Sequence, residues 1–549
     1  MTTLVLLCNG LANPKWRLNL EELGTFLESV FPGVAIEVAP DLCQRLEQVS
    51  SIVARRHAAR AVFGLCSADY NQVALQTCAK KAGLDPLGLE VVPLGMLCGM
   101  AHPQPHSTQK AKALLSAAVA KGRAFQGSRP EQEKLCFMPS DLKVSRRSLL
   151  TVPPMSYRPV PGIHQERCAA EAGCSLCATA CPRQALQVMG RGLFLDKTRC
   201  ESCGLCLSVC PRGAVDLPGW SLSQLESQLA ALLDSGTLCL GDFGILFTCQ
   251  RAVPKLEELA HQGVSYSHQW LPMAIPCLGM VTPAWILQAL ARGAQAVALL
   301  FCGAACPFGQ ASTIAGRVDF CRTLLRLLGR APDLVRLAAV SQTKGLLQIL
   351  EKPPAQQRND PRSRLEKPLC LATPEGSLTA IQYLAGVAGA SLDLAVGHTH
   401  SPFGLLEFRS DGCTGCLACV ERCPTGALAS ERSGDELAIT YAASQCVGCG
   451  ICAESCPECA TQVLRVNRVT DLGILSRGRV VLYRDRSVIC EGCKRAIGSR
   501  ALVKRLERLL AESSVAFGAH IARYCPSCRS ALAAGVRPRP SHRGGETEL

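Results

Sequence analysis

Two blocks of closely spaced cysteines constrain the fold of this chain more than any other feature of its sequence. Residues 200–211 read "CESCGLCLSVCP", in which four cysteines are separated by two, two and three residues and a proline follows the last one. The same run recurs at Cys413 and at Cys446, and a variant with five residues in its first gap begins at Cys168. The chain therefore has to fold around paired clusters of thiols rather than around apolar side chains alone.

This spacing is typical of ligands to a cubane iron–sulfur cluster. Three thiolates come from one tight loop, and in two-cluster ferredoxins the fourth cysteine of each run, which precedes a proline, ligates the other cluster. Zinc also binds C-x2-C pairs, but eight cysteines per block in this doubled order are not a zinc pattern. We therefore predict four 4Fe-4S clusters. The crossing rule gives four ligand sets: Cys168, Cys174, Cys177 and Cys210; Cys200, Cys203, Cys206 and Cys181; Cys413, Cys416, Cys419 and Cys456; and Cys446, Cys449, Cys452 and Cys423.

The composition favours a reducing compartment. The chain has 34 cysteines among 549 residues, yet its N-terminus lacks the basic region of an export signal and no run reaches 18 apolar residues. We expect a soluble cytoplasmic protein without a membrane span, whose thiols are free to bind metal. The net charge of +14 is spread along the chain, which indicates docking to acidic redox proteins rather than to nucleic acid.

Strand-like and helical stretches alternate on either side of the first cysteine block, which predicts a multidomain α/β protein with two bacterial-type dicluster ferredoxin (α+β) domains and a C-terminal four-cysteine metal-binding segment. The expected domains are an α/β domain at 1–135, a ferredoxin domain at 161–218, a second α/β domain at 219–335, a linker region at 336–404, a second ferredoxin domain at 405–470, a metal-binding segment at 471–535 and a disordered tail at 536–549.

The first 125 residues resemble the N-terminal domain of heterodisulfide reductase A. The stretches that carry the resemblance are "LVLLCNG" (4–10), "FPGV" (31–34), "DLC" (41–43), "ARAVFGLCSADYNQVALQTCAKKAGLDPLGLEVVPL" (59–94) and "CGMAH" (98–102). The resemblance implies that Cys8, Cys43, Cys66 and Cys98 hold a further 4Fe-4S cluster. The alternative is that they are buried cysteines of an α/β core. The G-x-G-x-x-G turn that opens the flavin domain of that family is absent from this sequence, so flavin-based bifurcation by this chain alone is not expected.

Residues 240–320 resemble the small iron–sulfur subunit of methyl-viologen-reducing hydrogenase. The matching stretches are "FTCQ" (247–250), "PCLGMV" (276–281) and "ALARGAQAVALLFCGAACPFGQ" (289–310). The resemblance implies a 2Fe-2S cluster on Cys249, Cys277, Cys302 and Cys306, although Ala252 stands where that family has a cysteine and the last pair is one residue closer. The alternative is again that these are buried core cysteines.

Two C-x2-C pairs, Cys490 with Cys493 and Cys525 with Cys528, enclose a basic helical stretch near the C-terminus. Two such pairs with a long insertion most often form a four-cysteine zinc site. An iron–sulfur or rubredoxin-like iron site and free thiols are the alternatives.

Many clusters in one chain, without a recognisable set of catalytic residues, predict an electron relay rather than a catalyst. We expect a non-catalytic subunit that connects an oxidoreductase of the hydrogenase, formate dehydrogenase or heterodisulfide reductase type to a second redox partner. Two other functions are open: an accessory protein that matures a complex iron–sulfur or molybdenum enzyme such as formate dehydrogenase, and a metal-scaffolded interaction protein.

Overall fold

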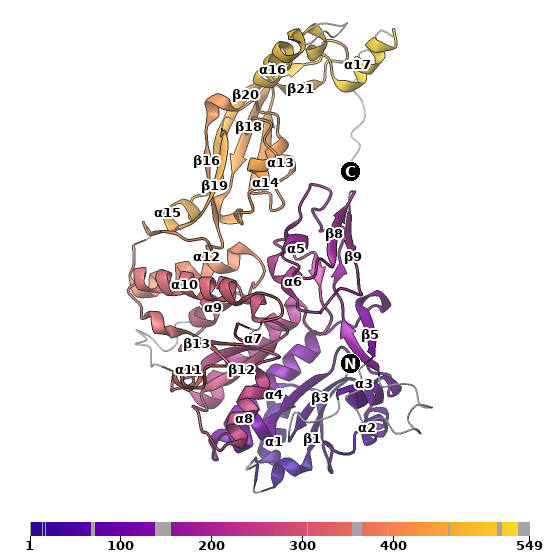
Figure 1. The fold of residues 1–549 in the computed structure, drawn as a ribbon, viewed down its shortest axis with the longest axis vertical. Coiled ribbons are helices and arrows are strands. Elements are labelled where there is room, and N and C mark those ends of the chain that lie inside the picture. Colours follow the sequence, from indigo (N-terminus) through magenta and orange to yellow (C-terminus); the bar gives the residue numbers. More distant parts are fainter. Residues whose placement is uncertain are drawn as a thin grey trace. The chain divides into compact units, whose positions relative to one another are not determined.

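The computed structural model of the chain (Figure 1) describes residues 2–13, 15–16, 18–66, 72–137, 155–190, 192–304, 306–353, 365–391, 393–458, 462–512 and 519–535. The chain forms two compact units, and the first comprises Met1–Glu171, Ser175–Leu392 and Thr399–Pro402. The second comprises Ala172–Cys174, Asp393–His398 and Phe403–Leu549. The predicted tail at 536–549 and part of the predicted linker, 354–364, lie outside the described residues.

The N-terminal part of the first unit is built on a four-stranded parallel sheet in the order β2-β1-β3-β4. Strands that are buried on both faces have continuous apolar sequences, and Leu4–Leu7 of the central strand are fully buried. Since the carboxyl ends of parallel strands meet at one edge, cysteines that follow β1 and β3 come together there. The elements are β1 (Thr2–Cys8), α1 (Leu20–Val30), β2 (Val34–Ala39), α2 (Gln48–Arg56), β3 (Ala58–Leu65), α3 (Gln72–Lys81), β4 (Glu90–Pro93) and α4 (His106–Ala124).

A second four-stranded parallel sheet, in the order β12-β11-β13-β14, forms the middle of the chain. Its last strand and the helix after it extend this domain beyond the predicted end at residue 335. Helix α7 begins with a capping box between Ser221 and Gln224 and packs along α4 of the N-terminal domain. The elements are α7 (Leu222–Leu240), β11 (Gly244–Cys249), α8 (Val253–His261), β12 (Trp270–Ile275), α9 (Pro283–Ala291), β13 (Ala296–Phe301), α10 (Ala311–Leu327), β14 (Val335–Ala339), α11 (Thr343–Ile349) and α12 (Pro374–Ala388).

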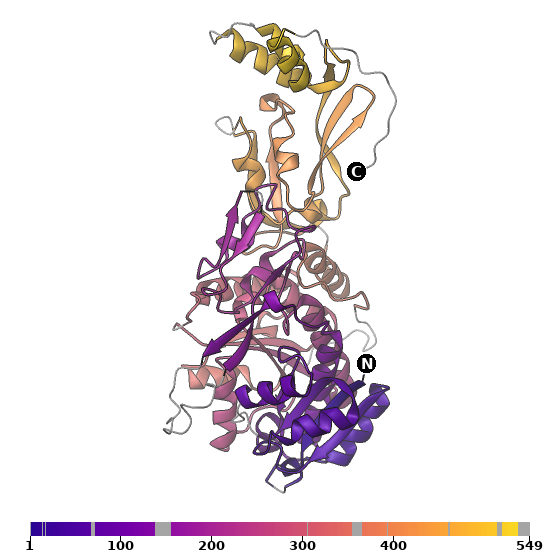
Figure 2. The same cartoon turned by 90° about the vertical axis from the view of Figure 1, so that its right-hand side faces the viewer.

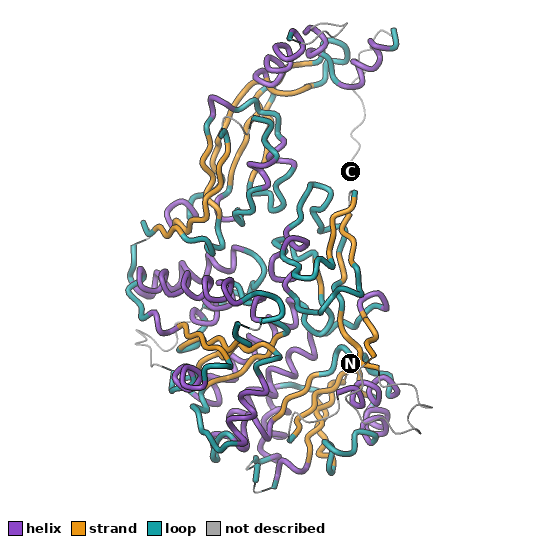
Figure 3. Tube along the Cα trace, in the orientation of Figure 1, coloured by secondary structure: helices purple, strands orange, loops and turns teal. Residues whose placement is uncertain are grey.

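The first cysteine block lies between these two α/β domains in the sequence and consists largely of loop, as the teal segments around its two short helices show (Figure 3). One short helix follows each cysteine loop, and a hairpin joins the two halves. The elements here and just before the block are β5 (Glu133–Phe137), β6 (Met155–Pro159), β7 (Gly162–Ile163), α5 (Leu176–Thr179), β8 (Leu186–Met189), β9 (Gly192–Leu195), α6 (Leu205–Val209) and β10 (Val215–Asp216).

The second unit contains the second cysteine block, which repeats this plan. Strand β20 pairs with hairpin strand β18, so the C-terminal segment continues the ferredoxin sheet. Figure 2 shows the helices of that segment, in yellow, at the far end of these strands. The elements are β15 (Ala395–Gly397), β16 (Gly404–Phe408), α13 (Ala418–Glu421), β17 (Leu428–Ser433), β18 (Glu436–Tyr441), α14 (Ile451–Glu454), β19 (Leu464–Asp471), α15 (Leu472–Leu475), β20 (Val480–Ile489), β21 (Ala496–Ser499), α16 (Arg500–Ala511) and α17 (Pro526–Ala533).

Within the described part of the chain, no helix is both long enough and apolar enough to span a membrane.

Candidate metal centres

The second ferredoxin block encloses a small cavity that is lined by the four cysteines of one predicted set: Cys413, Cys416, Cys419 and Cys456. Cys456 comes from the run that supplies the other set. Burial raises the pKa of Cys419 to about 12, and the neighbouring thiols add to this effect. Protonated thiols are therefore favoured when no metal is bound, because neighbouring thiolates would repel one another. A bound cation that replaces the protons would offset this repulsion.

A second cavity in the same block is lined by the other predicted set: Cys423, Cys446, Cys449 and Cys452. Here Cys423 is the residue that crosses over. The loops reach this geometry because Gly448 and Gly450 adopt left-handed backbone conformations, with φ of 64° and 80°. Burial raises the pKa of Cys446, whereas the Gly448 N–H and the Tyr441 hydroxyl lower it by donating to its sulfur. Both donor sets fit a cubane cluster.

The first block brings together the set Cys200, Cys203, Cys206 and Cys181. Cys206 is buried, which raises its pKa well above the usual range, and the thiols of the other three members and of Cys177 raise it further. Backbone N–H groups point at the sulfurs, as where Ala185 N donates to Cys181 Sγ at 3.2 Å. Such N–H···S bonds tune the reduction potential of a cluster.

The other predicted set of the first block is Cys168, Cys174, Cys177 and Cys210. Three of these cysteines, Cys168, Cys177 and Cys210, pack in the same apolar cluster as Cys181 and Cys206. Cys174 is half-buried and falls in the segment Ala172–Cys174, which groups with the second unit. The loop that carries Cys174 contains the extra residues of the first gap, where the sequence departs from the regular spacing.

Four cysteines of the middle domain gather at the carboxyl edge of its sheet: Cys249, Cys277, Cys302 and Cys306. Burial raises the pKa of Cys302 to about 12, and Cys249 and Cys306 add to this effect. Burial also acts to raise the pKa of Cys306, but N–H groups of Gln310 and Phe308 outweigh it and the pKa is lowered. Gly279 N also donates to Cys277 Sγ at 3.4 Å. The four thiols therefore form a donor set at one edge of the sheet that fits an iron–sulfur cluster, and Cys306 is the member whose thiolate the backbone N–H groups stabilise.

The middle-domain site adjoins the first ferredoxin block. Cys203 lies close enough to Cys277 for their charges to interact. The loops that carry them are in contact, since a Cβ on Gly204 would lie 2.7 Å from Met280 Cε and a Cβ on Gly279 would lie 2.6 Å from Leu205. A Cβ at either position would press on a buried side chain of the facing loop, which would then have to shift. The two candidate centres are therefore neighbours within the first unit.

The N-terminal domain brings together three of its four predicted cysteines. The sulfurs of Cys8, Cys43 and Cys66 all lie within 4.8 Å of one another. Hydrogen bonds from the other two thiols hold the pKa of Cys8 well below its usual range. Cys98 does not join this group among the described residues; it is fully buried on the short helix Gly95–Met100, where burial raises its pKa to about 12 and Lys110 opposes the rise.

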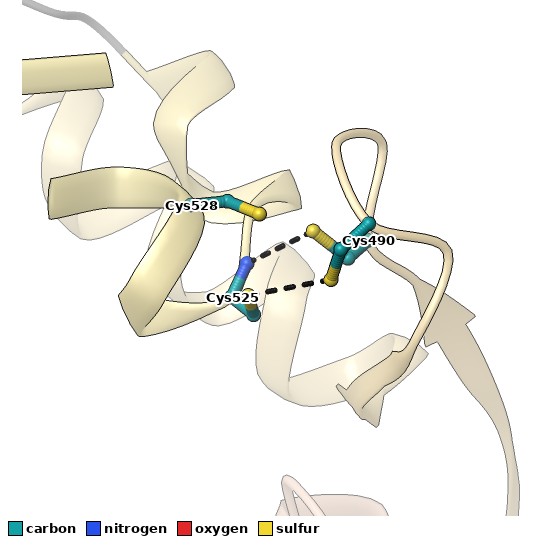
Figure 4. A group of neighbouring side chains, drawn as sticks. Cys490, Cys525 and Cys528 are labelled. Carbon is teal, nitrogen blue, oxygen red and sulfur yellow. Dashed lines mark hydrogen bonds between the residues drawn. The ribbon is translucent and has the colours of Figure 1, made fainter. Parts of the chain in front are cut away.

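The C-terminal segment brings its two C-x2-C pairs together in one buried group. The sulfurs of Cys490, Cys493, Cys525 and Cys528 are buried and within 4.8 Å of one another. Figure 4 shows the Cys525 N–H donating to Cys490 Sγ at 3.2 Å. A hydrogen bond from the Arg495 side chain lowers the pKa of Cys493 to about 6. A buried four-sulfur group with an adjacent guanidinium fits a tetrahedral metal site.

Two buried polar groups were not predicted from the sequence. Lys110 is fully buried, and its Nζ lies 3.0 Å from His102 Nε2 and 3.1 Å from the Tyr266 hydroxyl. Lys121 is also buried and pairs with Glu90 at 2.9 Å. Both lysines lie on α4, in a stretch with further basic residues that has the composition of a solvent-exposed helix. No local signal distinguishes them, because Tyr266 and Glu90, which complete their environments, are far away in the sequence.

Fold and donor geometry together define an iron–sulfur electron-transfer protein. Comparison with family models supports this class domain by domain. Residues 245–350 match the family model of the methyl-viologen-reducing hydrogenase delta subunit, and residues 160–214 and 406–470 match models of the 4Fe-4S dicluster domain. A comparison with curated proteins found no match.

These matches confirm the predicted fusion of a hydrogenase-subunit-like domain with two dicluster ferredoxin domains. Two dicluster domains imply about four 4Fe-4S clusters. The chain is therefore similar to redox subunits that work with protein partners.

Proposed function

We propose that the chain relays electrons between a catalytic oxidoreductase and a second redox partner, and that it performs no substrate chemistry itself. The observation that carries this proposal is the contact between the Cys203 and Cys277 loops, because it makes a ferredoxin centre and the middle-domain centre neighbours within one unit.

In this proposal the sixteen ferredoxin cysteines hold four 4Fe-4S clusters in the crossed sets given above, and the middle-domain cysteines hold a 2Fe-2S cluster. Bound clusters supply one-electron chemistry. The chain contributes burial of Cys206 and Cys277, which excludes water, and N–H donors to Cys306 and Cys181, which stabilise negative charge on sulfur.

We further propose that Cys8, Cys43 and Cys66 hold an additional cluster, as the resemblance to heterodisulfide reductase A implies. Their three sulfurs form a compact triad, and the fourth ligand is then a group other than Cys98, or Cys98 after a local rearrangement. We propose that the C-terminal site binds zinc. The bound zinc would stabilise the end of the ferredoxin sheet, to which the paired strands β20 and β21 belong. We place the protein in the cytoplasm, where thiols stay reduced.

The test uses protein purified anaerobically together with its native partner. Adding the substrate of the partner should bleach the iron–sulfur absorbance within the turnover time, and the iron content should be about 16 atoms per chain from the ferredoxin blocks, with more from the other sites. Clusters that remain oxidised while the partner turns over would contradict the relay.

A further inference from the structure

The C-terminal segment, residues 471–535, concentrates the positive charge of the chain. It contains twelve Lys and Arg residues but only five Asp and Glu residues, which gives it a net charge of +7. The whole chain has a net charge of +14. Although Lys and Arg occur along the whole chain, half of the net charge therefore lies in this one segment.

Three of the basic side chains form one stripe on helix α16 (Figure 1). Arg500, Lys504 and Arg508 follow one another at intervals of four residues, so they lie on the same face of the helix. All three are exposed. Like charges at this spacing repel one another and destabilise a helix. The stripe is therefore unfavourable for the chain alone, and negative charge from a partner would relieve the repulsion.

The carboxylates near the stripe do not neutralise it. Glu491 and Glu507 both pair with Arg523, Glu507 at 2.9 Å and Glu491 at 3.6 Å. Glu512 lies one turn beyond Arg508 on the same helix, but no ion pair joins them. Among the residues that the structure describes, none of the three side chains of the stripe has an ion-pair partner. Their charge is therefore directed to solvent.

The apolar side of α16 is covered incompletely. Val503 is the one residue of this helix that is buried. Leu502, Leu506 and Leu510 are half-buried, and Leu509, which follows Arg508, is 44% exposed. Surfaces that dock other proteins commonly combine a small apolar area with a polar, charged rim.

Helix α16 starts at a loop of the second ferredoxin block. Ser499, the N-cap residue of the helix, donates a hydrogen bond from its side chain to the carbonyl of Thr414. A Cβ on Gly415 would lie 2.9 Å from Ser499 Oγ, so the two segments are in close contact. Thr414 and Gly415 lie between Cys413 and Cys416. A protein that docks on α16 is thereby held beside the loop that carries two cysteines of one predicted cluster set.

We propose that the stripe of Arg500, Lys504 and Arg508 docks the acidic face of a small redox protein, which exchanges one electron with the cluster of the Cys413 set. The electron leaves the reduced centre of one protein as the oxidised centre of the other takes it up, and no bond is made or broken. The inference rests on the proposed relay and specifies where one of its partners binds.

Other occupants suit the stripe less well. A second copy of the chain would be repelled, because each copy has a net charge of +14. A nucleic acid offers negative charge, but α16 has no aromatic side chain on which bases could stack. The contact between α16 and a cluster loop favours a partner that carries electrons.

The experiment measures the binding of a small acidic ferredoxin to the full-length, cluster-loaded protein by anaerobic biolayer interferometry. Both proteins are oxidised, so the association rate is measured without electron transfer. The ferredoxin should bind, and it should associate faster as the salt concentration falls, because screening weakens. A single-stranded oligonucleotide is the second probe.

The stripe variant Arg500→Gln/Lys504→Gln/Arg508→Gln removes the three charges and keeps residues of similar helix propensity. It should slow association at low salt about 10-fold or more, and the difference from the wild type should disappear at high salt. Since the variant also removes repulsion along the helix, peptides covering residues 500–511 should exchange hydrogen no faster than in the wild type. Weaker binding then does not result from unfolding.

The matched control Lys81→Gln/Arg326→Gln/Arg432→Gln removes the same total charge from exposed positions outside the C-terminal segment. It should associate with the ferredoxin like the wild type. The control separates docking on α16 from general attraction by the net charge of the chain.

Three results would overturn the proposal. The ferredoxin does not bind to the wild type, or the stripe variant and the control associate with it at equal rates, so that the stripe has no special role. In the third case the oligonucleotide binds to the wild type more tightly than the ferredoxin and is lost in the stripe variant, so that the surface belongs to nucleic acid. The relay would be unaffected by any of these results, since it is tested by reduction of the clusters during turnover of the native partner.

Discussion

Gly204 provides the sharpest structural test of the contact between the first ferredoxin block and the middle domain. It follows Cys203, has a φ of 76°, and its missing Cβ would press against the sulfur of Met280 and lie 2.7 Å from Met280 Cε. Gly204→Ala therefore adds a methyl group in a left-handed conformation and pushes it against a fully buried side chain. Both effects oppose the native contact.

The two costs can be separated with a matched position. Gly450 follows Cys449 in the second block, has a φ of 80°, and its Cβ would meet nothing within 4 Å. Gly450→Ala should therefore cost only the backbone term, about 1 kcal/mol. Gly204→Ala should cost that amount plus an overpacking term of about 1–3 kcal/mol. The difference between the two variants measures the contact itself.

Hydrogen exchange with mass spectrometry is the suitable assay, because it reports local opening and does not require reversible unfolding of a cluster-loaded protein. In Gly204→Ala, peptides covering residues 203–209 and 277–281 should exchange faster than in the wild type. This acceleration should be about 5- to 150-fold larger than the acceleration that Gly450→Ala causes in the loop around residue 450. In Gly450→Ala, only the loop around residue 450 should exchange faster.

A double-mutant cycle with Met280→Ala completes this test. Removing the Met280 side chain should relieve the clash, so the effects of the two substitutions should fall short of additivity by about 1–3 kcal/mol. Equal exchange in the two glycine variants, or strict additivity in the cycle, would refute the contact and with it the proposed junction.

Three further predictions concern other sites. Cys302→Ser should remove the electron paramagnetic signal of the middle-domain centre, which is distinct from those of the cubanes, because a hydroxyl is a poor ligand for iron. The control Cys321→Ser, at a buried thiol outside the four middle-domain cysteines, should leave that signal unchanged, and loss of the signal in both variants would indicate unfolding. Burial lowers the pKa of Lys110 to about 8 from 10.5, so the unfolded state binds more protons between these values and the local stability around α4 should rise with pH across this window by about 3 kcal/mol relative to Lys110→Met. Hydrogen-exchange protection of α4 that differs between the two proteins by the same factor at pH 8 and pH 10 would contradict this. Arg495→Leu should raise the pKa of Cys493 from about 6 towards 9. The zinc affinity of the C-terminal site in this variant should therefore fall most between pH 6 and 8 and match the wild type above pH 9, and a pH-independent loss of affinity would show that Arg495 acts only by packing.

The sequence predicted the parts of the molecule that local spacing controls. The crossed partners Cys423 and Cys456 lie where the C-x3-C-P ends of the runs place them, because a short loop with left-handed glycines allows few alternatives. The strands that end at Cys8 and Cys249 were also predictable, since buried parallel strands are continuous apolar runs.

Features that depend on distant contacts could not be read in this way. Cys98 lies on a short helix that packs against both Cys66 and α4, yet its sulfur is outside the group of Cys8, Cys43 and Cys66, and the sequence spacing contains no sign of this. Pairing of β20 with β18 joins the C-terminal segment to the ferredoxin sheet, although the two cysteine-rich segments look separate in the sequence. The buried ion pair of Glu90 and Lys121 likewise depends on the packing of α4 against β4, which are 31 residues apart at these two positions.

The most direct test of the relay is the magnetic interaction between the two neighbouring centres. Electron paramagnetic spectra of the fully reduced protein should show the middle-domain signal broadened by the adjacent cubane cluster. Cys206→Ala, which removes a buried cysteine of the set proposed to hold that cubane, should sharpen the signal. A narrow middle-domain signal that is identical in the wild type and in Cys206→Ala would show that the two centres do not communicate, and the relay through Cys203 and Cys277 would be wrong.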